Sequence, residues 1–131
     1  MNHQFDEFEF FLEKPWSDGL PVVTPTEDRI SKMLSATRRS PDEIIGPIPP
    51  AMEIATVTSV ATHAVMAGCK PEYLPVVLGA TELMLQPEFN VNGVQGTMHG
   101  VAPMMIVNGP YALEIGTVSY THLTLPTILL V

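Results

Sequence analysis

Hydrophobic positions along the chain recur at helical spacing in three stretches. In the first stretch, residues 25–36, Ile30, Met33 and Leu34 share one face. The preceding Thr-Pro-Thr-Glu is typical of a capping box, in which Thr24 accepts a backbone amide and Glu27 reaches back to the cap. The pattern therefore predicts an amphipathic helix over residues 25–36.

Two further helices are predicted in the middle of the chain. One covers residues 57–65, and Gly68 is placed to end it in a left-handed conformation. The other opens at Pro71, and Pro75 would kink it or delay its start. The apolar positions of these two helices are Val57, Val60, Ala61, Ala64 and Val65, then Leu74, Val77, Leu78, Leu83 and Met84.

Shorter elements are predicted before these helices. Residues 1–14 mix phenylalanines with acidic residues, which favours a short amphipathic helix or an arm that docks on the remainder. Asp18 and Gly19 favour a tight turn. Ser-Pro-Asp-Glu at residues 40–43 repeats the capping device and predicts a short helix that Gly46 ends, followed by a proline-rich extended connector.

The order of elements near the C-terminus decides the predicted fold class. Asn92 and Gly93 indicate a turn, residues 104–107 form an apolar run typical of a buried strand, and residues 108–110 begin another helix. Helices followed by a strand and a helix predict an α/β or α+β fold, helix-rich in its N-terminal part with one short buried strand. We expect an incomplete domain over residues 15–116 whose later strands are missing.

Charge is distributed unevenly along the 131 residues, whose formal net charge is −8. This balance argues against nucleic acid and anionic membranes as partners, because both select clusters of Lys and Arg. Residues 54–131 hold one basic and four acidic side chains, against five basic and ten acidic in residues 1–53. So few charges are typical of a covered surface, and we expect a protein partner or a homo-oligomer contact through residues 54–116.

The location of the protein is predicted from what the sequence lacks. Residues 89–113 carry no charge, but their asparagines, glycines and prolines make a poor membrane-spanning helix, so no membrane association is expected. The first residues lack the basic and apolar regions of a secretory signal. Cys69 is the single cysteine, so an internal disulfide is excluded and a cytoplasmic setting is expected.

Residues 118–127 read Val-Ser-Tyr-Thr-His-Leu-Thr-Leu-Pro-Thr and look like the translation of a transposon-type sequencing adapter. The DNA word GTC-TCT-TAT-ACA-CAT-CTG-ACG-CTG-CCG-ACG encodes these residues in order. The same segment alternates its side chains, so a strand is the other interpretation of its pattern. We expect residues 117–131 to be a non-native tail and the natural sequence to end near Gly116.

Cys69 is the first candidate for chemistry. It lies between two predicted helices, where backbone amides, the positive end of the following helix and Lys70 would favour a thiolate. Such a thiolate would act as a nucleophile, a redox group or a metal ligand. The alternative is a small apolar residue that fills a corner between helices, as free cysteines often do.

A glycine-rich loop over residues 93–100 holds the second candidate, His99, together with Gln95 and Thr97. Backbone amides in such a loop are suited to bind an anion, and His99 is suited to general base catalysis or metal ligation. A small anionic substrate is the partner that this chemistry would take. The alternative is a histidine that is satisfied by backbone groups within a tight loop.

Four other residues are weaker candidates. Asn108 follows the predicted strand, at a position where α/β sheets bind ligands, or it caps the next helix. Trp16 and Asp18 would line a pocket or anchor an N-terminal clamp. His63 lies inside a helix, and a packing role is favoured there. No HxxxH or CxxC pair exists, so spacing predicts no metal site, and no cofactor follows from the sequence.

Four segments together carry a family resemblance. They are Trp-Ser-Asp-Gly-Leu-Pro-Val-Val-Thr-Pro-Thr-Glu (16–27), Ala-Val-Met-Ala-Gly-Cys-Lys-Pro-Glu-Tyr-Leu-Pro-Val-Val (64–77), Gly-Val-Gln-Gly-Thr-Met-His (93–99) and Ile-Val-Asn-Gly-Pro (106–110). Over residues 15–116 the chain resembles a bacterial family associated with thiol or selenol proteins that bear a U-G-S-C motif. The motif itself is absent. The resemblance implies Cys69, His99 and Asn108 as candidate site residues.

Two functions follow as expectations. In one, the chain is part of a bacterial oxidoreductase-like enzyme with a reactive Cys69 and an anion-binding loop around His99. In the other, it is a non-catalytic structural or partner-binding domain whose Cys69 is buried. A third interpretation, a metal-binding module, requires Cys69 and His99 to lie within a few ångströms of each other.

Overall fold

The computed structural model describes residues 6–116, and residues 1–5 and 117–131 lie outside the described range. The predicted non-native tail therefore falls outside the described residues. The chain divides into two compact units, Met1–His99 and Gly100–Val131.

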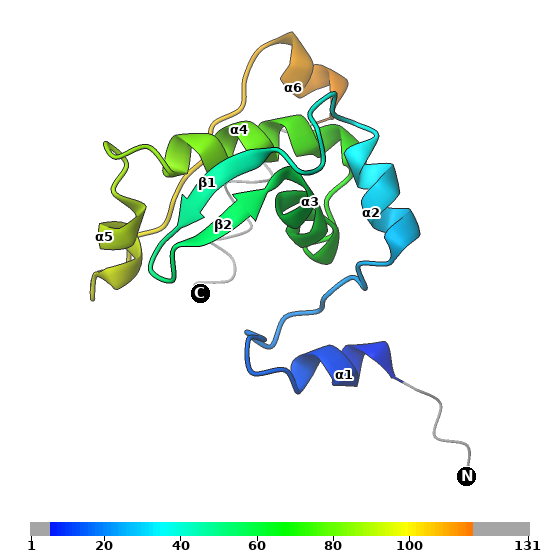
Figure 1. Ribbon diagram of the computed structural model, residues 1–131, viewed down its shortest axis with the longest axis horizontal. Coiled ribbons are helices and arrows are strands. Elements are labelled where there is room, and N and C mark those ends of the chain that lie inside the picture. The colour runs from blue at the N-terminus through cyan, green and yellow to red at the C-terminus, as the bar shows by residue number, and fades with distance from the viewer. Residues whose placement is uncertain (1–5, 117–131) are drawn as a thin grey trace. The chain divides into compact units, whose positions relative to one another are not determined.

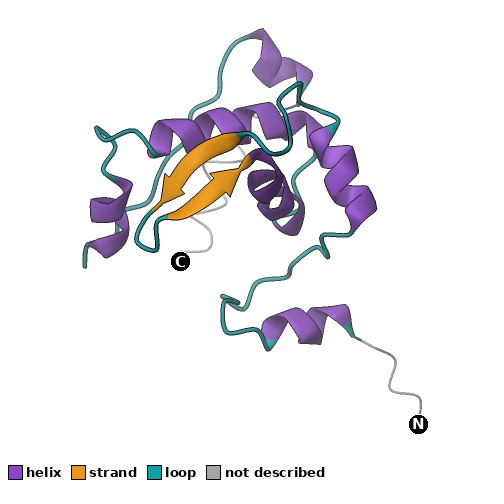
Figure 2. Cartoon of the chain, viewed as in Figure 1, coloured by secondary structure: helices purple, strands orange, loops and turns teal. Residues whose placement is uncertain are grey.

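The described residues form a helix-rich α+β structure, which confirms the predicted fold class (Figures 1 and 2). No helix among these residues combines the length and apolar character needed to cross a bilayer. The elements of the first unit are α1 (Glu7–Leu12), α2 (Glu27–Leu34), β1 (Ile44–Ile48), β2 (Glu53–Thr56), α3 (Val57–Met66), the 3-10 helix η1 (Pro71–Tyr73), α4 (Leu74–Met84) and α5 (Val91–Gly96). The second unit contains α6 (Pro110–Glu114).

The two strands form an antiparallel hairpin that contacts α3 through β2 and α4 through β1 (Figure 1). Pro47 pairs with Ile54 and Ile48 with Glu53, and the register shifts between Ile44 and Gly46. The short helix predicted over residues 40–46 is therefore wrong. β-branched isoleucines beside prolines suit a strand better than a helix, and the partner strand that stabilises them follows directly in the chain.

Helix α3 begins directly after the last residue of β2, Thr56, and is capped at both ends. Thr56 Oγ1 accepts the Ser59 amide at 3.2 Å, and Ser59 Oγ accepts the Thr56 amide at 2.8 Å. At the other end Gly68 adopts φ +75°, as predicted, and lies beyond the C-cap Ala67. These caps satisfy backbone groups that a helix terminus otherwise leaves unpaired.

Helix α2 confirms the element predicted over residues 25–36 but not its cap. Thr26, rather than Thr24, is the N-cap, and its hydroxyl accepts the Arg29 amide at 3.4 Å. The Thr24 hydroxyl instead donates to the Glu7 carboxylate of α1. Two threonines flank Pro25, so sequence spacing alone does not decide which of them caps the helix.

Pro75 delays the start of α4, as predicted, because the segment from Pro71 first forms η1 and only then an α-helix. Leu74 and Leu78 face the core, at 0 % and 1 % exposure. Leu83, predicted on the same face, is 69 % exposed. It lies five residues after Leu78, about 140° around the helix axis, which turns it towards solvent.

The core of the first unit forms where α2, β2, α3 and α4 meet. Its buried side chains are Met33, Ala55, Val57, Val60, Ala61, Ala64, Val65, Leu74 and Leu78. Val57 and Ala61 of α3 are fully buried, and small side chains along this helix let its neighbours approach closely. Helix α3 contacts α2, β2 and α4, so it is the central element of the unit.

Two predictions for residues 89–116 are wrong. Asn92 and Gly93 lie within α5 rather than in a turn, because Asn90 caps this helix through a bond from the Gly93 amide at 3.3 Å. Residues 104–107 form no strand, and Met104 and Ile106 are 72 % and 74 % exposed. An apolar run becomes a strand only where a partner strand pairs with it, and none of the described residues does so.

We predict that Leu74→Ala lowers the free energy of unfolding by about 2–5 kcal/mol, because it leaves a cavity in the core. Leu83→Ala is the matched control, since it removes the same atoms from an exposed position of the same helix, and its effect should stay within about 0.5 kcal/mol. Urea denaturation of both variants measures the difference. Equal losses would contradict the assignment of the buried face.

Candidate functional site

Cys69 forms part of the cap that ends α3. Its amide donates to the Ala64 carbonyl at 2.9 Å, and the Gly68 amide donates to the Val65 carbonyl at 2.9 Å. This pair of bonds is the Schellman motif, with Gly68 in the left-handed conformation that the motif requires. The Cys69 side chain is partly buried and packs against the core. The position therefore matches the corner-filling alternative.

The expected thiolate is not supported by the environment of Cys69. Burial raises the pKa of the thiol above its ordinary value of 9.0, so the protonated form is favoured at neutral pH. Cys69 also follows the carboxyl end of α3, where carbonyl groups carry partial negative charge. Sequence reasoning placed Cys69 correctly between two helices, but it overestimated the effect of the helix that follows.

The glycine-rich segment around His99 is half helical. Gln95 lies exposed within α5, and Thr97 is the residue that ends this helix. The Thr97 hydroxyl accepts the His99 amide at 3.3 Å, which is a local turn, and the His99 side chain is exposed. Because amides of residues 93–96 belong to the helix, they do not form the anion-binding loop that the sequence predicted.

Trp16 and Asp18 belong to the segment between α1 and α2. The Trp16 ring lies 6.0 Å from the Phe11 ring and is 55 % exposed. Asp18 Oδ1 accepts the Leu20 amide at 3.0 Å, and Gly19 adopts φ +85°, which confirms the predicted tight turn. Both side chains therefore have local roles, and neither lines the groove between β1 and α4.

Asn108 and His63 also have mainly local settings. Asn108 is exposed and lies before the N-cap of α6, which is Gly109, so the predicted capping role is wrong. Nδ1 of His63 is hydrogen-bonded to the Ser59 carbonyl at 2.8 Å within α3, which agrees with the role favoured for it.

Among the described residues, no hydrogen bond or ion pair joins the side chains of Cys69, His99, Gln95 and Thr97. No group of three or more His, Cys, Asp or Glu side chains in the described range could hold a metal ion. No direct polar contact therefore links these candidate side chains within the described range, and their grouping into one site stays a prediction.

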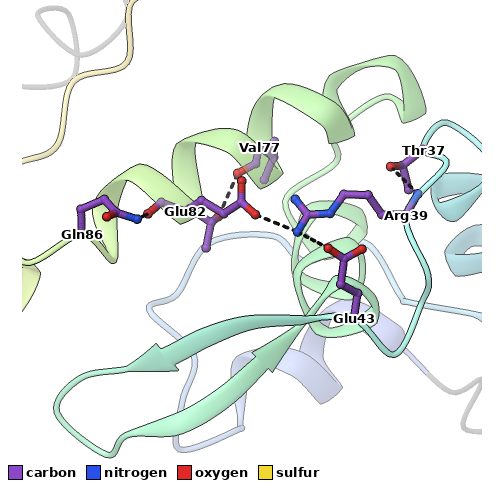
Figure 3. A network of polar contacts seen from close by, with 7 residues as sticks. Thr37, Arg39, Glu43, Val77, Glu82 and Gln86 are labelled. Carbon is purple, nitrogen blue, oxygen red and sulfur yellow. Dashed lines mark hydrogen bonds and ion pairs between the residues drawn. The ribbon is translucent and has the colours of Figure 1, made fainter.

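Sequence reasoning missed an ionic cluster centred on Arg39 (Figure 3). Arg39 Nη2 lies 2.8 Å from Glu43 Oε1 and 2.7 Å from Glu82 Oε1, so it links the start of the hairpin to α4. The hydrogen bond from Arg39 lowers the pKa of the Glu43 carboxyl, and the same bonds raise the pKa of Arg39. The two carboxylates and one guanidinium leave one negative charge in excess.

An open groove lies beside this cluster, between β1 and α4. Its volume is about 560 Å³, and it is neither enclosed nor flat. The residues that line it are Ile45, Gly46, Pro47, Gly79, Glu82, Leu83, Leu85 and Gln86. Only the fold brings these residues together, because they come from segments more than thirty positions apart in the sequence.

Comparison with known proteins found no match to a family model, a curated protein or a solved structure. The resemblance to the family associated with the U-G-S-C motif therefore stays a prediction.

We predict that Gly68→Ala destabilises the chain by about 1–2 kcal/mol, because alanine is strained in the left-handed conformation at the end of α3. A Cβ at this position would meet its nearest neighbour, Val23 Cγ2, at an ordinary 3.8 Å, so the loss would report backbone strain rather than a clash. Gly96→Ala is the control, at a glycine without positive φ. Thermal or urea unfolding measures both, and a neutral Gly68→Ala would contradict the capping role.

We predict that Glu43→Gln destabilises the chain at pH 7 and that the difference from the parent chain disappears in acid. The folded state lowers the pKa of this carboxyl from 4.5, so its contribution is complete above that pH and is lost as the pH falls through the folded value. Asp42→Asn is the charge-matched control. Denaturation curves from pH 7 downwards test this, and a difference that does not change with pH would contradict it.

Proposed function

We propose that the chain is a non-catalytic domain that binds a protein partner, and that Cys69 has a structural role. The observation that carries the proposal is the position of Cys69 in the cap of α3, with its side chain against the core and its pKa raised. A nucleophilic or redox cysteine requires the opposite, a lowered pKa at an accessible position.

The surface of the chain supports the second half of the proposal. Large apolar side chains are exposed on the hairpin, on α4 and in the segment after α5, and Ile44, Leu83 and Met98 are examples at 65 %, 69 % and 103 %. Extensive exposed apolar surface is typical of protein interaction sites. This agrees with the expectation, from the low charge of residues 54–116, that part of the chain is covered by a partner.

The alternative function is thiol-dependent chemistry on a small anionic substrate, with Cys69 and His99. It would need a groove or pocket that contains the thiol, and the groove between β1 and α4 is lined by neither residue. We also propose a cytoplasmic setting, which is expected from the single cysteine.

We predict that iodoacetamide modifies Cys69 in the folded chain several-fold more slowly than in urea at the same pH, with a half-maximal rate at a pH above 9.0. The reason is that burial keeps the thiol protonated. Cys69→Ala should retain the fold and the partner-binding property. Rapid alkylation of the folded chain near neutral pH would overturn the structural role and favour the enzyme.

A further inference from the structure

Gly79 lies in the interior of α4 although the backbone there does not require glycine. It has no positive φ, and a Cβ built on it would meet no atom within 4 Å. Glycine inside a helix is less favourable than alanine because it loses more conformational freedom on folding. The space above Gly79 opens into the groove between β1 and α4, so the missing side chain enlarges that groove.

Gly46 lies on the β1 side of the groove, where it adds no side chain that would fill the groove. Its φ of +153° favours glycine, and a Cβ there would approach Leu85 Cδ1 to 3.2 Å. Apolar groups from Ile45, Leu83 and Leu85 complete the lining, and Leu83 is 69 % exposed although it is a leucine. The groove thus offers an uncovered apolar surface to which another chain can approach closely.

The polar side of the groove is negative. Glu82 lines it, and only one oxygen of its carboxylate is engaged by Arg39, which is shared with Glu43. The excess negative charge at this cluster has the same sign as the net charge of −8 on the whole chain. A positively charged ligand is therefore attracted over long range and at the groove itself, whereas a second copy of the chain is repelled.

We propose that the groove between β1 and α4 binds a protein segment that carries both apolar and basic side chains. An apolar side chain of the partner occupies the space above Gly79, and a neighbouring Lys or Arg pairs with the free oxygen of Glu82. The inference rests on the proposed partner-binding function and names the class of partner.

The test uses the full chain, labelled with ¹⁵N, and three seven-residue peptides. The first alternates leucine and lysine, the second replaces lysine by glutamate, and the third replaces leucine by serine. We expect the leucine–lysine peptide to bind at least about tenfold more tightly than either of the others. Fluorescence anisotropy gives the dissociation constants, and chemical-shift changes should concentrate on the residues that line the groove.

Two variants examine the two features of the groove separately. Gly79→Leu fills the space above α4 and should weaken the peptide by about tenfold or more, whereas Gly96→Leu, at an open glycine of α5, should not. Glu82→Gln should weaken binding several-fold and reduce its dependence on salt, whereas Glu27→Gln, an equal loss of charge on α2, should not. Glu82→Gln keeps the size and shape of the partly exposed side chain, so the test stands even if Gly79→Leu does not fold.

Three outcomes would overturn the inference. Equal binding of the leucine–glutamate peptide would contradict the preference for a partner with basic side chains. Chemical-shift changes away from the groove would place binding elsewhere and leave the proposed function intact. A concentration-dependent dimer of the chain alone that Gly79→Leu abolishes would make the groove a contact between copies. The proposed function itself fails in a different measurement, by rapid alkylation of Cys69.

Discussion

The packing of α3 against α2, β2 and α4 is the constraint on which the first unit depends. Val57 and Ala61 have no exposed surface, and Leu74 and Leu78 of α4 close the same core. Small side chains on α3 bring the other elements near to its axis, and this proximity places β1 beside α4. The groove and the ionic cluster around Arg39 both lie where the hairpin and α4 come together beside this core.

Local signals in the sequence predicted the elements whose ends are decided by nearby residues. Gly68 ends α3 and Pro75 delays α4 because both effects act on the backbone of the residue itself. The hairpin and the exposure of residues 104–107 were not predictable in this way, since a strand depends on a partner elsewhere in the chain. The capping box at Thr56 was also missed, because serine replaces the usual glutamate or glutamine at Ser59.

The residues of the candidate site were likewise not predictable from local sequence signals alone. Residue types that carry reactivity directed attention to Cys69 and His99, yet one is built into a helix cap and the other is in a local turn. The groove is lined instead by residues with little chemical signature, such as Gly46 and Gly79. A glycine that its own backbone does not need is a weak signal in sequence and becomes informative only when the surrounding space is known.

Thr56 ends β2 and, through its hydroxyl, caps α3, so no linker separates the strand from the helix. A slip of one residue between the strands would rotate Ala55 out of the core and displace the residue that holds the first turn of the helix. The strand register and the start of the helix are thus coupled, and neither can change alone. The same coupling fixes the β1 side of the groove, because β1 stays aligned along α4 only as long as the first turn of α3 is intact.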